Sequence, residues 1–314
     1  MTQWPRAFSA LGRSAGARRA WLLPSDFGRQ AQSERSMKRV AILASPDKPA
    51  AVQTLGRMQQ WLRGRAQVVF AGLTYDGRQA LPHRPELLFS LGGDGTLISA
   101  AHSLGEQQLP IVGVNLGKLG YLAEFTMEEL EREGDFLFDG VLPLTRRIMM
   151  EVVLERREQP VFRTLAINDC VVLAGPPFHM IEVAVTVDGD EVTHVRGDGL
   201  IVATPSGSTA HNLAAGGPIL EPTGAAFILT PICPQALTFR PLVMDARRRI
   251  TIEIVQANPG TAIAADGRVM PFDGRDRIAI TRYSADFLLV RNPKRSEWSA
   301  LRRKLRWGEG PNVH

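Results

Sequence analysis

The feature of this sequence that most constrains its fold is an apolar segment that runs directly into a cluster of glycines. Residues 86–91 read Glu-Leu-Leu-Phe-Ser-Leu, Gly92-Gly-Asp-Gly-Thr96 follows, and a helical apolar pattern covers Leu97 to Leu104. A strand, a glycine turn and a helix in this order direct backbone N–H groups and the positive helix end at one place, which suits a phosphate. A bare Gly-Asp-Gly would more simply predict a turn with a helix N-cap. The flanking Gly92 and Thr96 and the preceding strand favour the functional interpretation, with Asp94 as its one carboxylate.

Neighbouring segments place this unit in an alternating α/β domain. Arg39–Ala44 predicts a short buried strand, and residues 51–62 carry apolar side chains at helical spacing. Residues 110–115 predict another strand, which again ends in a glycine-bearing loop. Alternating strands and helices indicate a parallel, Rossmann-like sheet whose ligand sites lie beyond the carboxyl ends of its strands. Both glycine loops fall at such ends.

After about Phe138 the apolar period changes to two, which predicts half-buried strands. Residues 181–187 alternate in this way, and an Asp-Gly turn after Val187 predicts a β-hairpin. We therefore expect an α/β domain at 37–140 that carries the glycine loop and a mostly antiparallel, all-β domain at 141–291. In the closing segment, 292–314, an amphipathic helix from Arg295 to Trp307 is expected to return to the first domain.

Composition excludes several classes of protein. In 314 residues with 44% hydrophobic content, the longest apolar runs stop well short of the roughly 20 residues that cross a bilayer. Cys170 and Cys233 lack metal-type spacing and are expected to be buried, reduced thiols in the cytoplasm. The net charge of +5 is scattered, and no nucleic-acid-binding signature accompanies it. We expect neither a nucleic-acid nor a membrane partner.

The first 36 residues differ from the remainder. They hold six arginines, no lysine, and only Asp26 and Glu34 as acids, without a sustained apolar period. An organelle-targeting peptide has this composition, but we favour a misassigned start upstream of Met37 and expect a disordered or spurious extension.

A second, longer motif covers residues 197–220. It reads Gly-Asp-Gly-Leu-Ile-Val-Ala-Thr-Pro-Ser-Gly-Ser-Thr-Ala and continues His-Asn-Leu-Ala-Ala-Gly-Gly-Pro-Ile-Leu. An apolar strand from Leu200 to Ala203 meets a hydroxyl-rich turn that can cap a helix beginning near Ala210. The small residues would also let a flat nucleotide lie close to the backbone, with Asp198 available to a ribose or amide group.

With these motifs the sequence resembles the NAD kinase family, within the superfamily that includes diacylglycerol and sphingosine kinases. The Gly92–Thr96 loop is shared with those lipid kinases and with phosphofructokinases, whereas the 197–220 motif selects NAD kinases. Residues 113–122 and Ala166-Ile-Asn-Asp169 match two further family blocks, and the similarity extends from about Lys38 to Trp307. The resemblance implies the two-domain NAD kinase fold and transfer of a phosphoryl group from ATP, or from polyphosphate, to the adenosine ribose 2′-hydroxyl of NAD.

The resemblance also implies roles for individual residues. Asp94 would be the general base, and Gly92, Gly93, Gly95 and Thr96 would form the phosphate-binding loop. Arg196 varies in the family, and a cation there favours oxidised NAD over NADH. Mg²⁺ would arrive with ATP without a dedicated metal site, and the chain would form a homodimer or homotetramer. The remaining residues expected to bind substrate are Asn115, Asn168, Asp169, His179, Asp198, Thr209, Ala210, His211, Asn212, Leu213, Ala214 and Arg268.

Three positions depart from the family pattern: it usually has Tyr at His211, His at Gln235 and Gln at Arg268. His83, His102, His194 and His314 show no metal-ligand spacing and are expected to be surface or packing residues. A lipid or other small-molecule kinase of the same superfamily remains an alternative, as does a catalytically silent NAD(P)-binding sensor. A Rossmann dehydrogenase is weaker, because no strand leads into Gly-x-Gly-x-x-Gly with an acid about 20 residues on.

Overall fold

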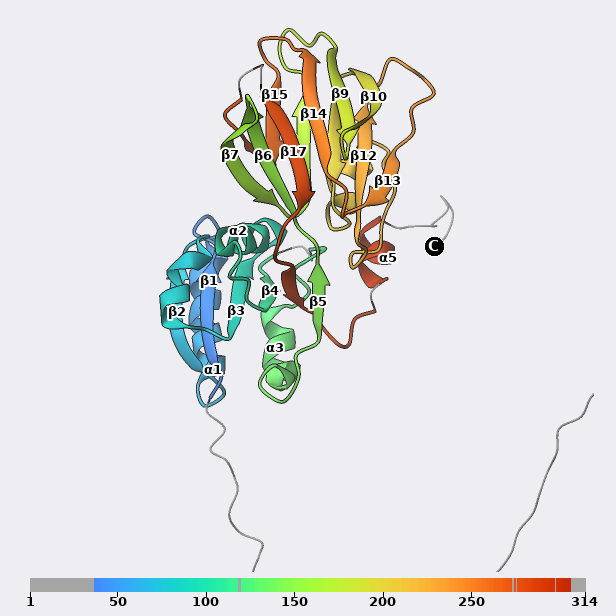
Figure 1. Cartoon of the computed structure of the whole chain (residues 1–314). Coiled ribbons are helices and arrows are strands. Elements are labelled where there is room, and N and C mark those ends of the chain that lie inside the picture. The colour runs from blue at the N-terminus through green and yellow to red at the C-terminus, as the bar shows by residue number, and fades with distance from the viewer. Residues whose placement is uncertain (1–36, 118–119, 273, 275, 297, 306–314) are drawn as a thin grey trace, which may run out of the picture. The chain divides into compact units, whose positions relative to one another are not determined.

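The first sheet of the computed structural model has six strands in the order β2-β1-β3-β4-β18-β5 (Figure 1). The strands β2, β1, β3, β4 and β18 run parallel, and β5 pairs antiparallel with β18. The bounds are β1 Arg39–Ala44, β2 Gln67–Leu73, β3 Leu87–Gly92, β4 Ile111–Asn115, β5 Leu144–Arg147 and β18 Phe287–Val290. The structure describes residues 37–117, 120–272, 274, 276–296 and 298–305. The prediction about residues 1–36 lies outside this part of the chain.

Helices cover both faces of this sheet because its strands are apolar on both sides. Val40 and Ile42 pack with α1 and α3, whereas Ala41 and Leu43 pack with α2. Successive side chains of β1 thus point to opposite faces of the sheet and belong to two separate hydrophobic cores. The helices are α1 Ala50–Leu62, α2 Asp94–Leu104 and α3 Met127–Glu133, with 3₁₀ turns η1 Gly77–Gln79, η2 Leu81–His83 and η3 Gly134–Leu137.

The second domain packs two six-stranded antiparallel sheets against each other. Their orders are β10-β9-β14-β17-β6-β7 and β13-β12-β11-β8-β15-β16. Alternate residues such as Val183 and Val185 fill the shared core with Val172 and Leu200, which confirms the expected period-two burial. The bounds are β6 Met150–Arg156, β7 Gln159–Ala166, β8 Asp169–Leu173, β9 Ile181–Val187, β10 Asp190–Gly197, β11 Gly199–Ala203, β12 Ala226–Ile232, β13 Leu242–Asp245, β14 Ile250–Gln256, β15 Ala262–Ala265, β16 Arg268–Val269 and β17 Arg277–Arg282.

The hairpin predicted after Val187 is present between β9 and β10. Asp188 and Gly189 both have positive φ, 53° and 93°, which is the backbone that an Asp-Gly hairpin turn requires. The helix expected near Ala210 is short: η4 Gly207–Thr209 precedes α4 His211–Ala214. The closing helix is α5 Ser299–Leu305.

Two structural findings differ from the sequence-based expectations. The strands β5 and β18 lie within 141–291, yet their hydrogen bonds place them in the first sheet. This pairing joins segments more than a hundred residues apart, which local periodicity does not report. The buried position expected for Cys233 is wrong: Cys170 is buried in β8, but Cys233 lies just after β12 and is exposed.

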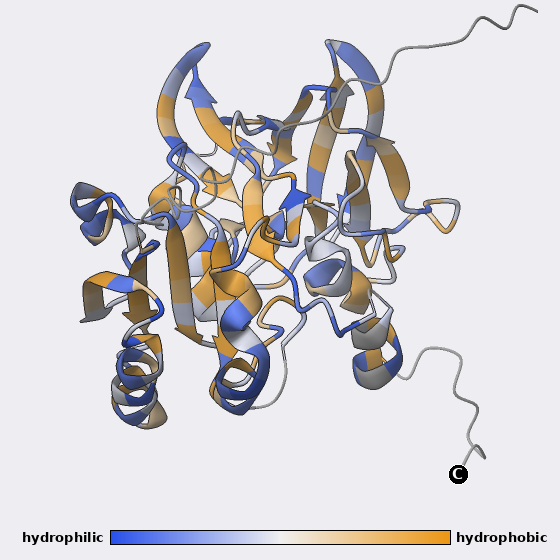
Figure 2. Cartoon of the chain, turned by 90° about the horizontal axis from the view of Figure 1, so that it is seen from below, coloured by the Kyte–Doolittle hydropathy of each residue, from blue (hydrophilic) through white to orange (hydrophobic). Residues whose placement is uncertain are grey.

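Hydropathy follows these layers. In Figure 2 the strands carry much of the hydrophobic colour, and the helices show hydrophilic surfaces beside them. Among the described helices, none combines the length and the apolar composition of a membrane span.

Candidate active site

The carboxylate of Asp94 is held by three consecutive backbone amides. Asp94 is the first residue of α2, and Gly93 precedes it as the N-cap. The N–H of Tyr121 donates to Oδ2 at 2.7 Å, and the N–H groups of Leu122 and Ala123 each donate to Oδ1 at 3.0 Å. We call Asp94 with residues 121–123 the Asp94 clamp. It fixes an acid at the carboxyl edge of the parallel sheet, where ligands bind in this class of fold.

The glycine before these amides is required by the clamp. A Cβ on Gly120 would lie 1.8 Å from Oδ1 of Asp94, so no larger residue fits while the carboxylate keeps this position. Earlier in the same loop, Oδ1 of the buried Asn115 accepts the N–H of Gly117 at 2.7 Å. Asn115 thus shapes the loop that forms the clamp.

The glycine loop brings three segments together at the end of β3. A Cβ on Gly92 would lie 2.0 Å from Oγ1 of Thr96, which sits one helical turn later. The carbonyl of Gly92 accepts the N–H of Leu116 at 2.9 Å and the ammonium of Lys48 at 3.1 Å. Gly95 is exposed, and nothing lies within 4 Å of its would-be Cβ. Space beside the helix N-terminus is therefore open.

A second carboxylate, that of Asp266, is held by three consecutive amides in the β-rich domain. Asp266 lies in the turn between β15 and β16 with a φ of 47°. The N–H of Ile167 donates to Oδ2 at 2.7 Å, and those of Asn168 and Asp169 donate to Oδ1 at 2.8 and 3.3 Å. We call Asp266 with residues 167–169 the Asp266 clamp. Burial raises the pKa of Asp266, and the three N–H bonds oppose that rise.

The Asp266 clamp orders two residues that were predicted to bind substrate. Asp169 is 6% exposed, and burial together with the negative charge of Asp266 raises the pKa of its carboxyl to about 7. Within the described chain, no hydrogen bond from another residue reaches the side-chain oxygens of Asn168 or Asp169. Both side chains therefore retain their hydrogen-bonding capacity for a ligand.

The motif after β11 packs directly on this pair. The N–H of Thr204 donates to the carbonyl of Asn168 at 2.8 Å, and a Cβ on Gly207 would lie 2.1 Å from the same oxygen. Close approach of two backbones thus explains the glycine. Farther on, His211 and Ala214 are exposed, whereas Leu213 is partly buried. The N–H of Ala210 donates to the carbonyl of Gly207.

Asn212 has a structural set of contacts. Its side chain is fully buried, its Nδ2 donates to the carbonyls of Ser208 and Pro218 at 3.1 Å, and its Oδ1 accepts the hydroxyl of Thr230 at 2.7 Å. These bonds join α4 to the loop after it and to β12. The bond to Ser208 also fixes the backbone next to Thr209, which lies at the wall of the cavity described below.

Three predicted residues lie away from the two clamps. Asp198 follows β10, where its N–H donates to the carbonyl of Ile232 and its carbonyl accepts the N–H of Ala174. Ala174 follows the end of β8 opposite to Asp169, and at a normal strand rise the two ends of β8 lie about 13 Å apart. Arg196 is exposed on β10, and His179 is exposed in the loop before β9. None of the three lines the cavity described below or donates to the carboxylate of Asp94 in the described chain.

Arg268 joins the two domains. Its NH1 donates to Nδ1 of His102 at 2.8 Å, and its NH2 donates to Oγ of Ser99 at 3.2 Å, both on α2. Because guanidinium only donates, Nδ1 must accept, and Nε2 carries the proton toward Oγ1 of Thr164 at 3.1 Å. Burial and the positive charge of Arg268 lower the pKa of His102 to about 4. His102 is thus a neutral packing residue.

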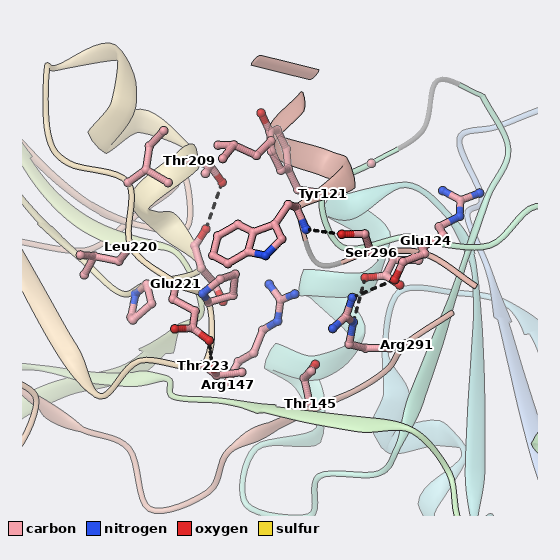
Figure 3. Close-up of a pocket in the computed structure, with 18 residues that line it drawn as sticks. Tyr121, Glu124, Thr145, Arg147, Thr209, Leu220, Glu221, Thr223, Arg291 and Ser296 are labelled. Carbon is pink, nitrogen blue, oxygen red and sulfur yellow. Dashed lines mark hydrogen bonds and ion pairs between the residues drawn. The ribbon is translucent and has the colours of Figure 1, made fainter. Parts of the chain in front are cut away.

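A cavity of about 430 Å³ opens beside the Asp94 clamp (Figure 3). Tyr121 and Arg147 project toward it from different elements, and Arg291 lies 3.7 Å from Glu124 at its wall. The ammonium of Lys304 in α5 lies 4.8 Å from the centre of the Tyr121 ring, which brings the closing helix to this loop. The lining residues are Gly120, Tyr121, Glu124, Thr145, Arg147, Pro205, Ser206, Thr209, Ile219, Leu220, Glu221, Pro222, Thr223, Arg291, Arg295, Ser296, Trp298 and Leu301.

Sequence reasoning missed several of these residues. Tyr121 was inside a recognised block, and the glycine before it was the signal that a side chain approaches closely. Trp298 lies in the segment that the sequence predicts only as an amphipathic helix. Arg147 ends β5 and Arg291 directly follows β18, the two strands whose sheet was not predicted. No cluster of three His, Cys, Asp or Glu side chains suited to a metal ion occurs among the residues that the structure describes.

Comparison with known proteins gives the same picture. The ATP-NAD kinase N-terminal domain matches residues 64–140, and the ATP-NAD kinase C-terminal domain matches residues 167–292. A NAD kinase from Syntrophotalea carbinolica is 38% identical over 285 residues, covering 87% of this chain and all of the relative. Another from Rhodopirellula baltica is 36% identical over 272 residues and 86% of each chain. This chain belongs to the NAD kinase family.

Solved structures agree with the fold. A NAD kinase from Archaeoglobus fulgidus in complex with ATP superposes with a TM-score of 0.68 and 29% identity, covering 82% of this chain and 94% of that one. A yeast NADH kinase complexed with NADH superposes with a TM-score of 0.76 over 90% of this chain and 91% of its own. At 24% identity, the yeast enzyme supports the fold alone. The expected two-domain NAD kinase fold is confirmed.

Proposed function

We propose that this protein transfers the γ-phosphoryl group of ATP to the adenosine ribose 2′-hydroxyl of NAD, giving NADP and ADP. The observation that carries the proposal is the position of the Asp94 clamp beside a cavity that is also lined by Thr209 of the second motif. Family membership supports the acceptor, and the ATP complex of the Archaeoglobus fulgidus relative supports the donor.

Asp94 is proposed as the general base. A carboxylate offers about four lone-pair positions, and three are used by the amides of residues 121–123, so one remains on Oδ2. The bond from the ribose oxygen to the γ-phosphorus forms while the bond from that phosphorus to ADP breaks, and the hydroxyl proton passes to Asp94. In a loose transition state the proton moves late, and an ordinary carboxylate suffices. Mg²⁺ enters as part of the MgATP substrate and neutralises phosphate charge.

The acceptor is proposed to contact both clamps. Its adenosine would enter the cavity between Tyr121 and Thr209, and Asn168 and Asp169 would bind hydroxyl or amide groups through their open side-chain positions. His179, Arg196 and Asp198 would then serve the site of a second copy in the proposed homodimer or homotetramer, because none of them lines the cavity beside the Asp94 clamp of their own chain. Sedimentation of the purified protein tests that assembly, and a monomer that turns over NAD at full rate contradicts it.

The direct test is an NADP assay with NAD and MgATP, and separately with NAD and inorganic polyphosphate. Asp94→Asn is expected to lower kcat by about 10²- to 10⁴-fold, the usual contribution of a general base, while NAD still binds. Asp135→Asn is the matched control, because Asp135 is exposed and pairs with Arg65 on the surface.

The outcomes separate the alternatives. NADP formation that persists in Asp94→Asn would remove the base from the mechanism. Tight NAD binding with no NADP from either donor would favour the silent sensor, and phosphorylation of a lipid instead of NAD would favour the other branch of the superfamily.

A further inference from the structure

Lys48 lies against the glycine loop and was not identified from the sequence. It belongs to the loop between β1 and α1, is partly buried, and donates from Nζ to the carbonyl of Gly92 at 3.1 Å. A Cβ on Gly93 would lie only 3.2 Å from the same Nζ, so a residue larger than glycine would crowd the ammonium. The cation therefore bonds Gly92 and lies beside Gly93, the two residues immediately before Asp94.

The charge of Lys48 has no carboxylate counterpart in the described part of the chain. Its nearest sequence neighbour with a negative charge, Asp47, instead accepts the hydroxyl of Tyr75 at 2.7 Å. Other basic residues of the chain do have carboxylate partners: Lys294 pairs with Glu133 at 2.7 Å and Arg295 with Glu129 at 2.5 Å. A partly buried cation is costly without an anion, which indicates that an anion from outside the chain completes this position.

The surroundings select phosphate as that anion. An ammonium has three N–H donors, and Gly92 takes one, so two remain. The N-terminus of α2, an eleven-residue helix, adds positive charge at the same place, and the open space at Gly95 leaves room for a ligand. The acceptor cavity is bounded by other residues, Gly120 and Tyr121, on the Asp94 clamp. The Lys48 side is thus available to the second substrate.

We infer that Lys48 binds the terminal phosphoryl group of the donor and stabilises its negative charge during transfer. The inference rests on the proposed function and adds to it a division of the site: Tyr121 marks the acceptor side of Asp94, and Lys48 marks the donor side. Lys48 would be a catalytic residue because its ammonium touches the reacting phosphate. The alternative is an anchor that only ties the first loop to the carbonyl of Gly92.

The experiment compares Lys48→Met and Lys48→Arg with Lys38→Met in the full chain. Lys38 is a matched control: it is also partly buried and donates from Nζ to a backbone carbonyl, that of Leu137 at 2.8 Å, but it precedes β1 instead of following it. Three quantities are measured: kcat/KM for MgATP, the thermal midpoint, and equilibrium affinities. The affinity probes are NAD, AMP and the magnesium complex of the β,γ-imido analogue of ATP.

Lys48→Met is expected to lower kcat/KM for MgATP by about 10²-fold, the size seen when one charge-stabilising donor is removed. The affinity for the imido analogue should fall about tenfold, those for AMP and NAD should not change, and Lys48→Arg should retain an intermediate rate. Lys38→Met should match the wild type in turnover and in every affinity.

Two results would overturn the assignment. One is a Lys48→Met protein whose turnover and analogue affinity stay within twofold of wild type. The other is a parallel loss of NAD affinity, AMP affinity and thermal stability, which an anchor would cause. If the wild type makes no NADP at all, the proposed function fails, and the binding of the imido analogue to Lys48→Met and wild type still decides the role of Lys48.

Discussion

In both clamps three consecutive backbone N–H groups donate to one carboxylate, but the residue proposed to act on substrate differs. In the α/β domain, the backbone of residues 121–123 holds the carboxylate of Asp94, and the carboxylate is the proposed general base. In the β-rich domain, the carboxylate of Asp266 holds the backbone of residues 167–169, and the groups proposed to bind substrate are the side chains of Asn168 and Asp169. The comparison teaches that a buried-looking acid bound by three amides is no indication of catalysis in itself. The role of each clamp depends on whether the carboxylate or the backbone segment that it binds faces the ligand.

Gly120→Ala should break the first clamp and have the largest effect. Its Cβ would lie 1.8 Å from Oδ1 of Asp94, so the carboxylate must leave the amides or the loop must move. We expect kcat to fall by about 10²- to 10³-fold, because misplacing a reacting group by an ångström costs about 10²-fold. Steady-state NADP formation measures this. Gly64→Ala is a poor control because φ is +76° there, whereas Gly56→Ala meets nothing within 4 Å and should leave kcat unchanged.

Asp266→Ala should break the second clamp and reduce stability. Three backbone N–H groups lose their acceptor, and alanine is disfavoured at a φ of 47°. We expect the free energy of unfolding to fall by about 3 kcal/mol, within the range for orphaned buried donors. Denaturant titration is the measurement. Asp266→Asn keeps an acceptor oxygen and tolerates the left-handed backbone, so a loss as large as that of alanine would contradict the clamp.

Asp169→Asn should change how the stability of the protein depends on pH, which tests the second clamp further. The pKa of Asp169 is raised in the folded state to about 7 from 3.8, so its ionisation opposes folding. The protonated Asp169 therefore makes its full contribution to the free energy of unfolding below about pH 4, and that contribution is lost as pH rises through about 7. The variant should therefore have a higher thermal midpoint than wild type at pH 8 and an equal one near pH 4, while NAD affinity falls about tenfold at pH 8. Calorimetry at both pH values checks this, and a variant less stable at pH 8 would refute it.

Arg268→Gln, which restores the usual family residue, should have the smallest effect. It removes a cation beside His102, so the pKa of His102 should rise from about 4 toward its ordinary value. Loss of one interdomain contact should change stability by about 1 kcal/mol. NMR titration of the imidazole measures the pKa. If that pKa does not move while NAD affinity falls sharply, Arg268 contacts the substrate instead of α2.

Local patterns predicted most elements of the fold. Arg39–Ala44 was located to the residue, and the strand, glycine loop and helix around Asp94 were found because apolar runs and glycines act over a few positions. The pairing of strands that are far apart in the chain could not be predicted from these local patterns. Nothing in residues 144–147 or 287–290 reports that they join the first sheet, and nothing near Asp266 reports that its carboxylate reaches residue 167.

The candidate site followed the same rule. Asp94, Asn168 and Asp169 were identified through motifs, whereas Lys48 and the cavity walls at Arg147 and Trp298 depend on packing. Exposure is also a tertiary property, which is why Cys233 was assigned incorrectly.

The return of β18 has a consequence for how the chain is made. Leu289 pairs with Ile111, and Phe287–Val290 also bonds β5, so the edge of β4 stays uncovered until the last strand leaves the ribosome. The amino-terminal half of the protein cannot finish its sheet before residues 287–290 have been made. A fragment that stops at residue 140 would present an open parallel edge, and supplying residues 141–305 as a separate polypeptide should close it.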